Sequence, residues 1–326
     1  MVSWASNDNL YKMILKGIVS PCKSLNIDPV VYDIIKHIKS DVPIVPITRV
    51  ENFEFNSDLL NLDRYIIADF TEYGWNWDMQ HTHFFGRNTA TYFYDMFNGD
   101  EWNRFNSFVR DREPLLYFKR ELLSKDVRKD ILPIEFPAFN PVPEPQTKEE
   151  FNKRLLQVAN IWGLSHEGRK KVHGQIWQDS GKHNYIVYDN IATINAFLNR
   201  ETHPSKWLTA YVPWYSRFEM QTVLGISGNS KITTSWGGAG RKCFRHTEAS
   251  VNSVMAMWDD GIEWTYAWED QKNCIKCEEG KEIETIVEAL RNPYLYDIYR
   301  EGIKTAEMYY LPNYISHLEK TIREYI

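Results

Sequence analysis

Hydrophobic residues follow strand and helix patterns that alternate in both halves of the 326-residue chain. In the first half, helical spacing of apolar residues predicts a helix at 29–40. Short runs rich in β-branched residues predict strands at 42–47, 64–70 and 115–122. The run at 115–122 also fits a short helix. In the second half, the patterns predict strands at 155–163, 185–190, 207–212 and 231–236, and helices at 165–177 and 217–225. This alternation favours two α/β domains with mainly parallel sheets.

Five prolines lie between Pro133 and Pro145. Each proline fixes φ and removes a hydrogen-bond donor, so this stretch is expected to form neither a central strand nor a helix. A semi-rigid linker, placed at residues 141–147, is therefore expected to follow an N-terminal domain of residues 1–140.

Composition and charge narrow the class of protein. The chain is 43% hydrophobic and 25% charged, and it contains no apolar run long enough to span a bilayer. Its N-terminus lacks the pattern of a signal peptide, so we expect a cytoplasmic protein. The net charge of −6 gives no overall basic field for nucleic acid. Local basic clusters occur at 119–120, 169–171 and 241–242, and they are either solvated faces or the lining of a site for an anion.

The stretch GGAGRKCFRHTEA, residues 237–249, contains the chain's most distinctive candidate chemistry. Gly238 and Gly240 follow the strand at 231–236, and a helix is expected to begin near residue 242 or 243. Glycines let the backbone approach an anion closely, and the free N–H groups of a helix N-terminus favour phosphate. Arg245 and Glu248 are three residues apart and share a helix face, where they suit a phosphate and a sugar hydroxyl. Spacing alone also allows a plain glycine loop with a surface Arg–Glu pair.

The segment 232–249 resembles the donor loop of GT-B-type glycosyltransferases, especially the spore-coat and exostosin-like ones, which often show G-x-G followed by C-[FY]-R-x-x-E-A. The resemblance covers about residues 150–326. It implies a GT-B-like α/β fold of two Rossmann-type domains facing a cleft. A nucleotide-sugar donor domain would occupy 148–305, and a C-terminal helix at 306–326 would return to the first domain.

The same resemblance assigns roles to single residues. Arg245 would contact the diphosphate, Glu248 a hydroxyl of the nucleotide or sugar, and the loop with Gly238 and Gly240 would hold the phosphates. Trp162-Gly163 followed by Arg169 resembles the first strand-turn-helix of a donor domain, and Asn273 lies in a late loop that resembles one near the donor. The implied donor-binding set is Arg169, Gly238, Gly240, Arg245, Glu248 and Asn273.

Three positions depart from the family pattern. Arg241 stands where an acidic residue is common, which could alter donor choice. Ser253 replaces a common glycine. Ala256 stands where retaining enzymes often carry a second glutamate, so the stereochemical outcome stays open.

The catalytic base is expected at the end of the strand at 64–70. Asp69 and Glu72 are the candidates to take the proton of the acceptor hydroxyl, with Trp75 and Trp77 as an aromatic wall for a sugar ring. His81 and His83 are two residues apart, so on a strand they would share one face, and both are further candidates for the base.

No metal and no cofactor are expected. Cys274 and Cys277 form a C-x-x-C without a second ligand pair, and Asp259-Asp260 is more typical of a turn before Gly261. That acidic pair remains the alternative, as the metal site of the other glycosyltransferase fold.

The function expected is transfer of a sugar from a nucleotide diphosphate to a hydroxyl of a glycan or small molecule. One alternative is a non-catalytic module that binds nucleotide or glycan. Another is a transferase acting on modified bases of DNA, which the acidic net charge disfavours.

Overall fold

The structure, a computed structural model, describes residues 34–35, 37–42, 44–47, 64–70, 115–127, 129–161, 172, 175, 182, 187–189, 220–236, 242, 244–259 and 261–326. Contacts divide the chain into two compact units. The first comprises Met1–Phe136, Glu263–Thr265 and Pro312–Ile326, and the second comprises Pro137–Ile262 and Tyr266–Leu311.

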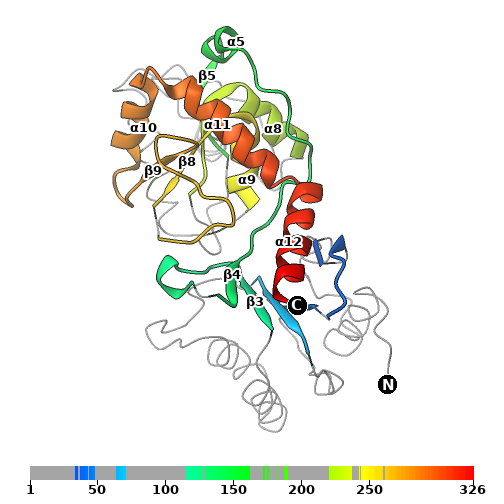
Figure 1. The fold of residues 1–326 in the computed structure, drawn as a ribbon. Helices are drawn as coiled ribbons and strands as arrows, with labels where there is room; N and C mark the ends of the chain where they lie inside the picture. The colour runs from blue at the N-terminus through cyan, green and yellow to red at the C-terminus, as the bar shows by residue number, and fades with distance from the viewer. Residues whose placement is uncertain are drawn as a thin grey trace, which may run out of the picture. The chain divides into compact units, whose positions relative to one another are not determined.

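The first unit is built on a four-stranded parallel sheet in the order β1-β2-β3-β4 (Figure 1). Its strands are β1 (Ile44–Ile47), β2 (Ile66–Asp69), β3 (Leu116–Lys119) and β4 (Ile131–Pro133), and a 3-10 helix, η3, spans Ser124–Asp126. The side chains of Leu116, Tyr117 and Phe118 are all buried, as expected for an inner strand covered on both faces. Among the described strands, β4 lies at the edge of the sheet, a position that tolerates Pro133.

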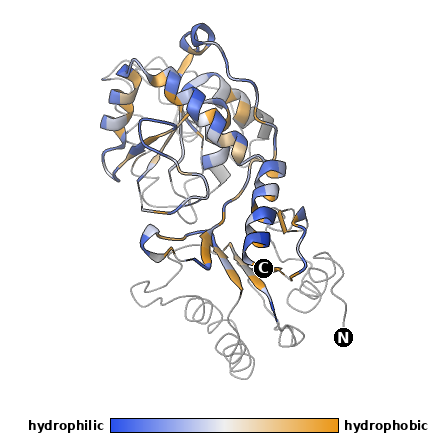
Figure 2. Cartoon of the chain, viewed as in Figure 1, coloured by the Kyte–Doolittle hydropathy of each residue, from blue (hydrophilic) through white to orange (hydrophobic). Residues whose placement is uncertain are grey.

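Helix α12 (Leu311–Tyr325) also belongs to the first unit. Pro312 lies in its first turn, where the missing N–H costs no hydrogen bond. Its buried residues are Tyr314, Ile315, Leu318 and Ile322, which form one apolar stripe. Figure 2 shows the corresponding mixture of hydrophilic and hydrophobic residues along the helix.

The second unit contains a five-stranded parallel sheet in the order β6-β5-β7-β8-β9. Its strands are β5 (Leu156–Asn160), β6 (Val187–Asp189), β7 (Ser230–Thr234), β8 (Val254–Trp258) and β9 (Ile275–Cys277). β5 is the first strand of this sheet along the chain, and its neighbours are β6 on one side and β7 on the other.

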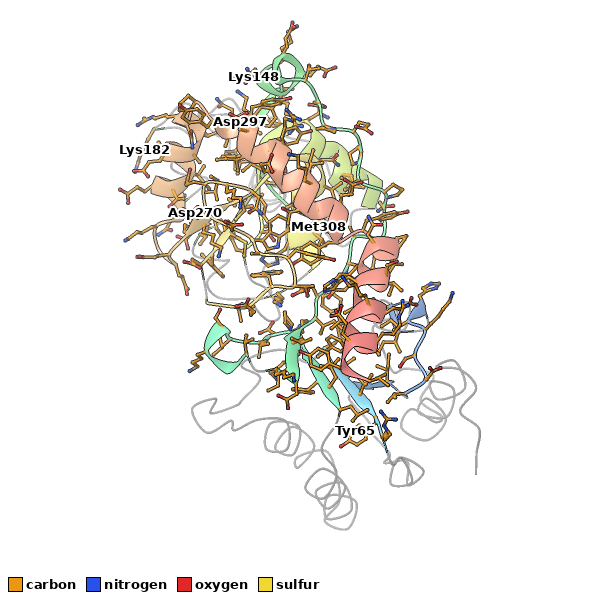
Figure 3. All side chains as sticks on the ribbon, in the orientation of Figure 1. Tyr65, Lys148, Lys182, Asp270, Asp297 and Met308 are labelled. Carbon is orange, nitrogen blue, oxygen red and sulfur yellow. The ribbon has the colours of Figure 1, made fainter. Side chains whose placement is uncertain are left out.

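Helices of the second unit pack against this sheet and one another. They are α5 (Lys148–Asn152), α8 (Met220–Gly228), α9 (Phe244–Asn252), α10 (Glu282–Arg291) and α11 (Leu295–Met308). Val158, Ile232 and Val254 from three adjacent strands share a core with Ile286 of α10 and Ile298 of α11. Figure 3 labels Lys148 at the start of α5, and Asp297 and Met308 near the two ends of α11.

The expected α/β class with parallel sheets is confirmed in both units. The strands predicted at 42–47, 64–70, 155–163, 185–190 and 231–236 are found with narrower bounds, and 115–122 contains a strand, β3. The helix predicted to close at Gly225 instead continues to Gly228. The helix predicted at 165–177 and the strand at 207–212 lie largely or wholly outside the described residues. The domain limits at 140, 147 and 305 stay predictions.

Candidate functional site

The candidate site lies at the carboxyl ends of the neighbouring strands β5 and β7. Strand order changes direction here, because the chain continues from β5 to β6 on one side and later returns to β7 on the other. Such a switch point, at the carboxyl ends of parallel strands, is where open α/β sheets bind ligands. The two strand ends are tied together: the Thr234 hydroxyl bonds the side-chain oxygen of Asn160 and lies 3.3 Å from the Ala159 carbonyl oxygen.

Beyond β7 the chain is held firmly up to the start of the glycine loop. The Ser235 N–H donates to the Ala256 carbonyl at 2.7 Å. The rings of Trp236 and Trp258 have centroids 5.7 Å apart, and the Trp258 indole N–H donates to Glu282 Oε1 at 2.6 Å. The glycine-rich stretch therefore follows a fixed, buried residue, Trp236, and Gly238 and Gly240 themselves lie outside the described residues.

Helix α9 follows the glycine loop and begins at Phe244, one residue after the region expected from the sequence. Arg245 lies in its first turn, where the side chain is not described, and Glu248 lies one turn later and is half-buried. The helix N-terminus adds a partial positive charge to that end of the loop. Phosphate bound there would meet the free backbone N–H groups of the first helical turn.

Ser253, one of the departures from the family pattern, joins the far end of α9 to β7. Its hydroxyl lies 2.7 Å from Thr233 Oγ1 and 2.8 Å from the Ala249 carbonyl oxygen, and the residue is fully buried. A serine therefore fits at this position by bonding its hydroxyl within the core.

Lys242 belongs to the basic pair at 241–242, which the sequence assigns either to a solvated face or to the lining of a site for an anion. It lies between the glycine loop and α9 and is only 1% exposed. Lysine is almost never fully buried unless it is paired. The sequence offers no signal for this burial, because Arg241 and Lys242 read as an ordinary basic pair.

Asn273 is described completely, and its side chain is engaged within the second unit. The Oδ1 atom accepts from the Glu269 N–H at 2.7 Å, and Nδ2 donates to the Ala267 carbonyl at 2.9 Å and to Thr305 Oγ1 at 3.0 Å. These contacts anchor the loop between β8 and β9 to α11. A direct contact of Asn273 with a donor stays a prediction that this geometry does not favour.

The same loop contains the other residues considered for metal binding. Asp259 follows β8 and lies 3.4 Å from Lys276 Nζ, while Asp260 is outside the described residues. Cys274 and Cys277 are buried free thiols, and burial raises the pKa of the Cys274 thiol to about 12. Within the described residues, no group of three metal-ligating side chains comes together.

In the first unit, Asp69 ends β2 and is paired in register with Lys119 at the end of β3. The side chain of Asp69 is not described. Glu72, Trp75, Trp77, His81 and His83 lie outside the described residues, as does Arg169 in the second unit. Among the helices that the structure describes, none has the length and apolar character needed to cross a membrane.

Neither protein-family models nor curated proteins match the chain. Solved structures similar to it include TarM, with 12% identity and a TM-score of 0.47, and the GtfA/B complex, with 10% and 0.46. Another is HepE of Anabaena in complex with UDP and glucose, with 9% identity and a TM-score of 0.43. The match with TarM covers 90% of this chain and 57% of TarM. The match with the GtfA/B complex covers 82% of this chain and 59% of the other, and the match with HepE covers 82% and 79%. The chain thus spans less than two thirds of TarM and of the GtfA/B chain.

Proposed function

We propose that the chain is a glycosyltransferase that moves a sugar from a nucleotide diphosphate to a hydroxyl of an acceptor. One observation carries the proposal: the stretch that resembles a GT-B donor loop joins β7 to α9 beside the switch point of a parallel sheet. A strand, glycines and a helix N-terminus in this order form a recurring phosphate-binding arrangement.

The donor would lie across the carboxyl ends of β5 and β7. Gly238 and Gly240 would present backbone N–H groups to the diphosphate, and Arg245 would bind it through its guanidinium. Glu248, one turn further along α9, would accept a hydrogen bond from a hydroxyl of the nucleotide or sugar. Arg169 follows β5 in sequence and would approach the donor from the neighbouring strand end.

Transfer breaks the bond between the anomeric carbon and the phosphate oxygen and forms a bond from that carbon to the acceptor oxygen. The electron pair of the broken bond stays on the diphosphate, whose growing negative charge Arg245 and the N-terminus of α9 stabilise. Charge stabilisation of this kind is usually the largest contribution to rate. Asp69 or Glu72 takes the proton of the acceptor hydroxyl.

The acceptor is assigned to the class of glycans and small molecules rather than DNA. A DNA-modifying enzyme needs cationic contacts to many phosphates, and a net charge of −6 does not favour them. The reaction is also proposed to need no metal, because glycine backbone and arginine would neutralise the diphosphate.

A panel of nucleotide sugars tests the proposal, with binding followed by thermal shift and turnover by release of free nucleoside diphosphate. At least one donor is expected to bind and to be turned over, also with EDTA present. Loss of turnover that Mn²⁺ restores would support the acidic pair at 259–260 instead. Binding without turnover on any acceptor would indicate a non-catalytic module, and no binding of any donor would refute the proposal.

The base is tested by Asp69→Asn, which keeps the shape of the side chain and removes its basicity. Transfer is expected to be abolished while nucleotide binding stays intact. Full activity in this variant would exclude Asp69 as the base and leave Glu72 as the candidate.

A further inference from the structure

Arg120 directly follows β3 and is a buried arginine with few contacts. Its side chain is 5% exposed, and its closest carboxylate contact is 3.4 Å, from Nη2 to Glu121 Oε1. The Nε atom is buried without a hydrogen-bond partner among the described residues. The guanidinium carbon lies 5.2 Å from the ring centroid of Phe136. Guanidinium carries five N–H donors, so this arrangement leaves most of its bonding capacity unused.

A second buried arginine in the same chain shows what a structural role requires. Arg154 donates from Nε to Gln146 Oε1 at 3.0 Å and from Nη1 to the Ser230 carbonyl oxygen. Its guanidinium carbon also lies 4.7 Å from the ring centroids of both Phe151 and Tyr299. Arg154 therefore has both polar and aromatic partners, whereas the described residues give Arg120 one long polar contact and one ring.

A buried charge that is incompletely paired is unfavourable, and one further anion would complete its contacts. Strong arginine–carboxylate and arginine–phosphate pairs use two parallel hydrogen bonds of about 2.7–2.9 Å. The 3.4 Å contact to Glu121 is well outside that range. The geometry around Arg120 thus leaves guanidinium N–H donors with which an anion can pair.

The location of Arg120 is also that of a ligand site. Lys119 ends β3 and pairs in register with Asp69, the candidate base at the end of β2, so Arg120 lies one residue beyond this pair. Adjacent strands are only about 4.8 Å apart. Arg120 and Asp69 therefore leave neighbouring strands at the carboxyl edge of the sheet, where parallel α/β sheets bind ligands.

The surroundings of Arg120 are fixed by hydrogen bonds. The Leu122 carbonyl accepts from the Glu263 N–H at 2.8 Å. Glu135 accepts from the Thr265 N–H at 3.0 Å and from the Tyr314 hydroxyl at 2.9 Å. These bonds hold the segment 263–265 and α12 against the strand ends of the first unit, so the residues around Arg120 are held before any ligand arrives.

We propose that Arg120 binds an anionic group of the acceptor, so that the acceptor carries a phosphate or a carboxylate near the hydroxyl that receives the sugar. This inference rests on the proposed function, because it takes the ligand of the first unit to be a glycosyl acceptor. It narrows the acceptor to phosphorylated or acidic glycans and small molecules.

The test is calorimetric titration of the full-length protein with inorganic phosphate and, separately, with acetate. Saturable binding of at least one probe is expected in the wild-type protein. Arg120→Met is expected to weaken it about tenfold or more, because a charge-assisted pair is lost, and Arg120→Lys to weaken it less. Arg154→Lys is the matched control and should leave the affinity unchanged. Preference for phosphate or for acetate identifies which anionic group the acceptor carries.

The donor loop also binds phosphate in this account, so each titration is repeated in Arg245→Ala. Phosphate binding that survives Arg245→Ala but is lost on changing Arg120 supports the inference. Absence of saturable binding of either probe, or equal affinity in the wild type and Arg120→Lys, overturns it. Should Arg120→Met fail to fold, Arg120→Lys decides. A UDP titration of the same proteins tests the proposed function separately, since a protein that fails to bind UDP can still show Arg120-dependent binding of phosphate.

Discussion

Tyr314 joins α12 to the end of β4 through a single buried hydroxyl. The hydroxyl donates to Glu135 Oε2 at 2.9 Å and accepts from the Glu135 N–H at 2.8 Å. Tyr314→Phe removes one hydrogen bond from the Glu135 N–H and one from Glu135 Oε2, which keeps its bond from the Thr265 hydroxyl. The change is expected to cost about 1–3 kcal/mol in the free energy of unfolding of the first unit. Urea denaturation measures the loss. Tyr294→Phe, at a residue 67% exposed, should be neutral.

The contribution of Tyr314 can also be measured through the pH dependence of the free energy of unfolding at alkaline pH. Burial raises the pKa of Tyr314 well above its usual value, and the nearby Glu135 carboxylate adds to the shift. The unfolded phenol loses its proton near pH 10, whereas the folded phenol keeps it. The stability that this group contributes is therefore full below about pH 10 and falls as the pH rises further. Tyr314→Phe should show a shallower decline than the wild type between about pH 9.5 and 11.

The thiols of the C-x-x-C are expected to be unreactive in the folded protein. Burial is the main reason that the pKa of Cys274 is raised to about 12, and burial likewise raises the pKa of Cys277. At pH 8 almost no thiolate is present to react. With Cys22 and Cys243 replaced by serine, Ellman's reagent should titrate no thiol in the native state and two after denaturation. Fast reaction of a native thiol would contradict this assignment.

Single residues differ in how far the sequence could predict them. The order of Arg245 and Glu248 after a glycine loop is a local pattern, so sequence reasoning could place both on one helix. The burial of Lys242 and Arg120 results from packing between distant segments, which a basic pair in the sequence does not reveal. Asn273 is a further residue whose contacts the sequence does not reveal. Its three side-chain hydrogen bonds reach residues up to 32 positions away, and no local pattern indicates them.

Two glycines in helices predict opposite effects of the same substitution. A Cβ at Gly302 of α11 would lie 2.7 Å from the Asn273 carbonyl oxygen, whereas a Cβ at Gly225 of α8 would meet no atom within 4 Å. Gly302→Ala is expected to destabilise the second unit by about 1–3 kcal/mol through overpacking against backbone. Gly225→Ala should stabilise it by about 0.5–1 kcal/mol, since alanine is the better helix residue. Thermal unfolding of both variants checks the pair, and destabilisation of equal size in both would contradict it.

At the level of elements, buried strands were the most predictable part of the fold. β2, β5 and β7 are short apolar runs that pattern alone identifies. Helix α5 has only five residues, too few for a periodic pattern, and it depends on the capping box of Thr147 and Glu150. The end of α8 was misplaced because a glycine usually ends a helix, yet here the helix continues through Gly225 with open space beside it.

For the whole molecule, the alternation of strands and helices indicated two parallel sheets, and both are present. The first unit takes Glu263–Thr265 and Pro312–Ile326 from beyond the second sheet. Assignment of α12 to that unit depends on contacts such as the one between Tyr314 and Glu135, which are 179 residues apart. Pairing over such a separation follows from tertiary packing, which no local pattern in the sequence reveals.

The proposed function depends on binding of a nucleotide diphosphate by the segment from β7 to α9. Calorimetric titration of UDP and other nucleoside diphosphates into the wild-type protein and Arg245→Ala tests it most directly. The wild type should bind at least one of them, and a folded Arg245→Ala protein should bind it about tenfold or more weakly, because a charge-assisted pair with the diphosphate is lost. Equal affinity in the two proteins, or no binding of any nucleoside diphosphate by the wild type, would contradict the account.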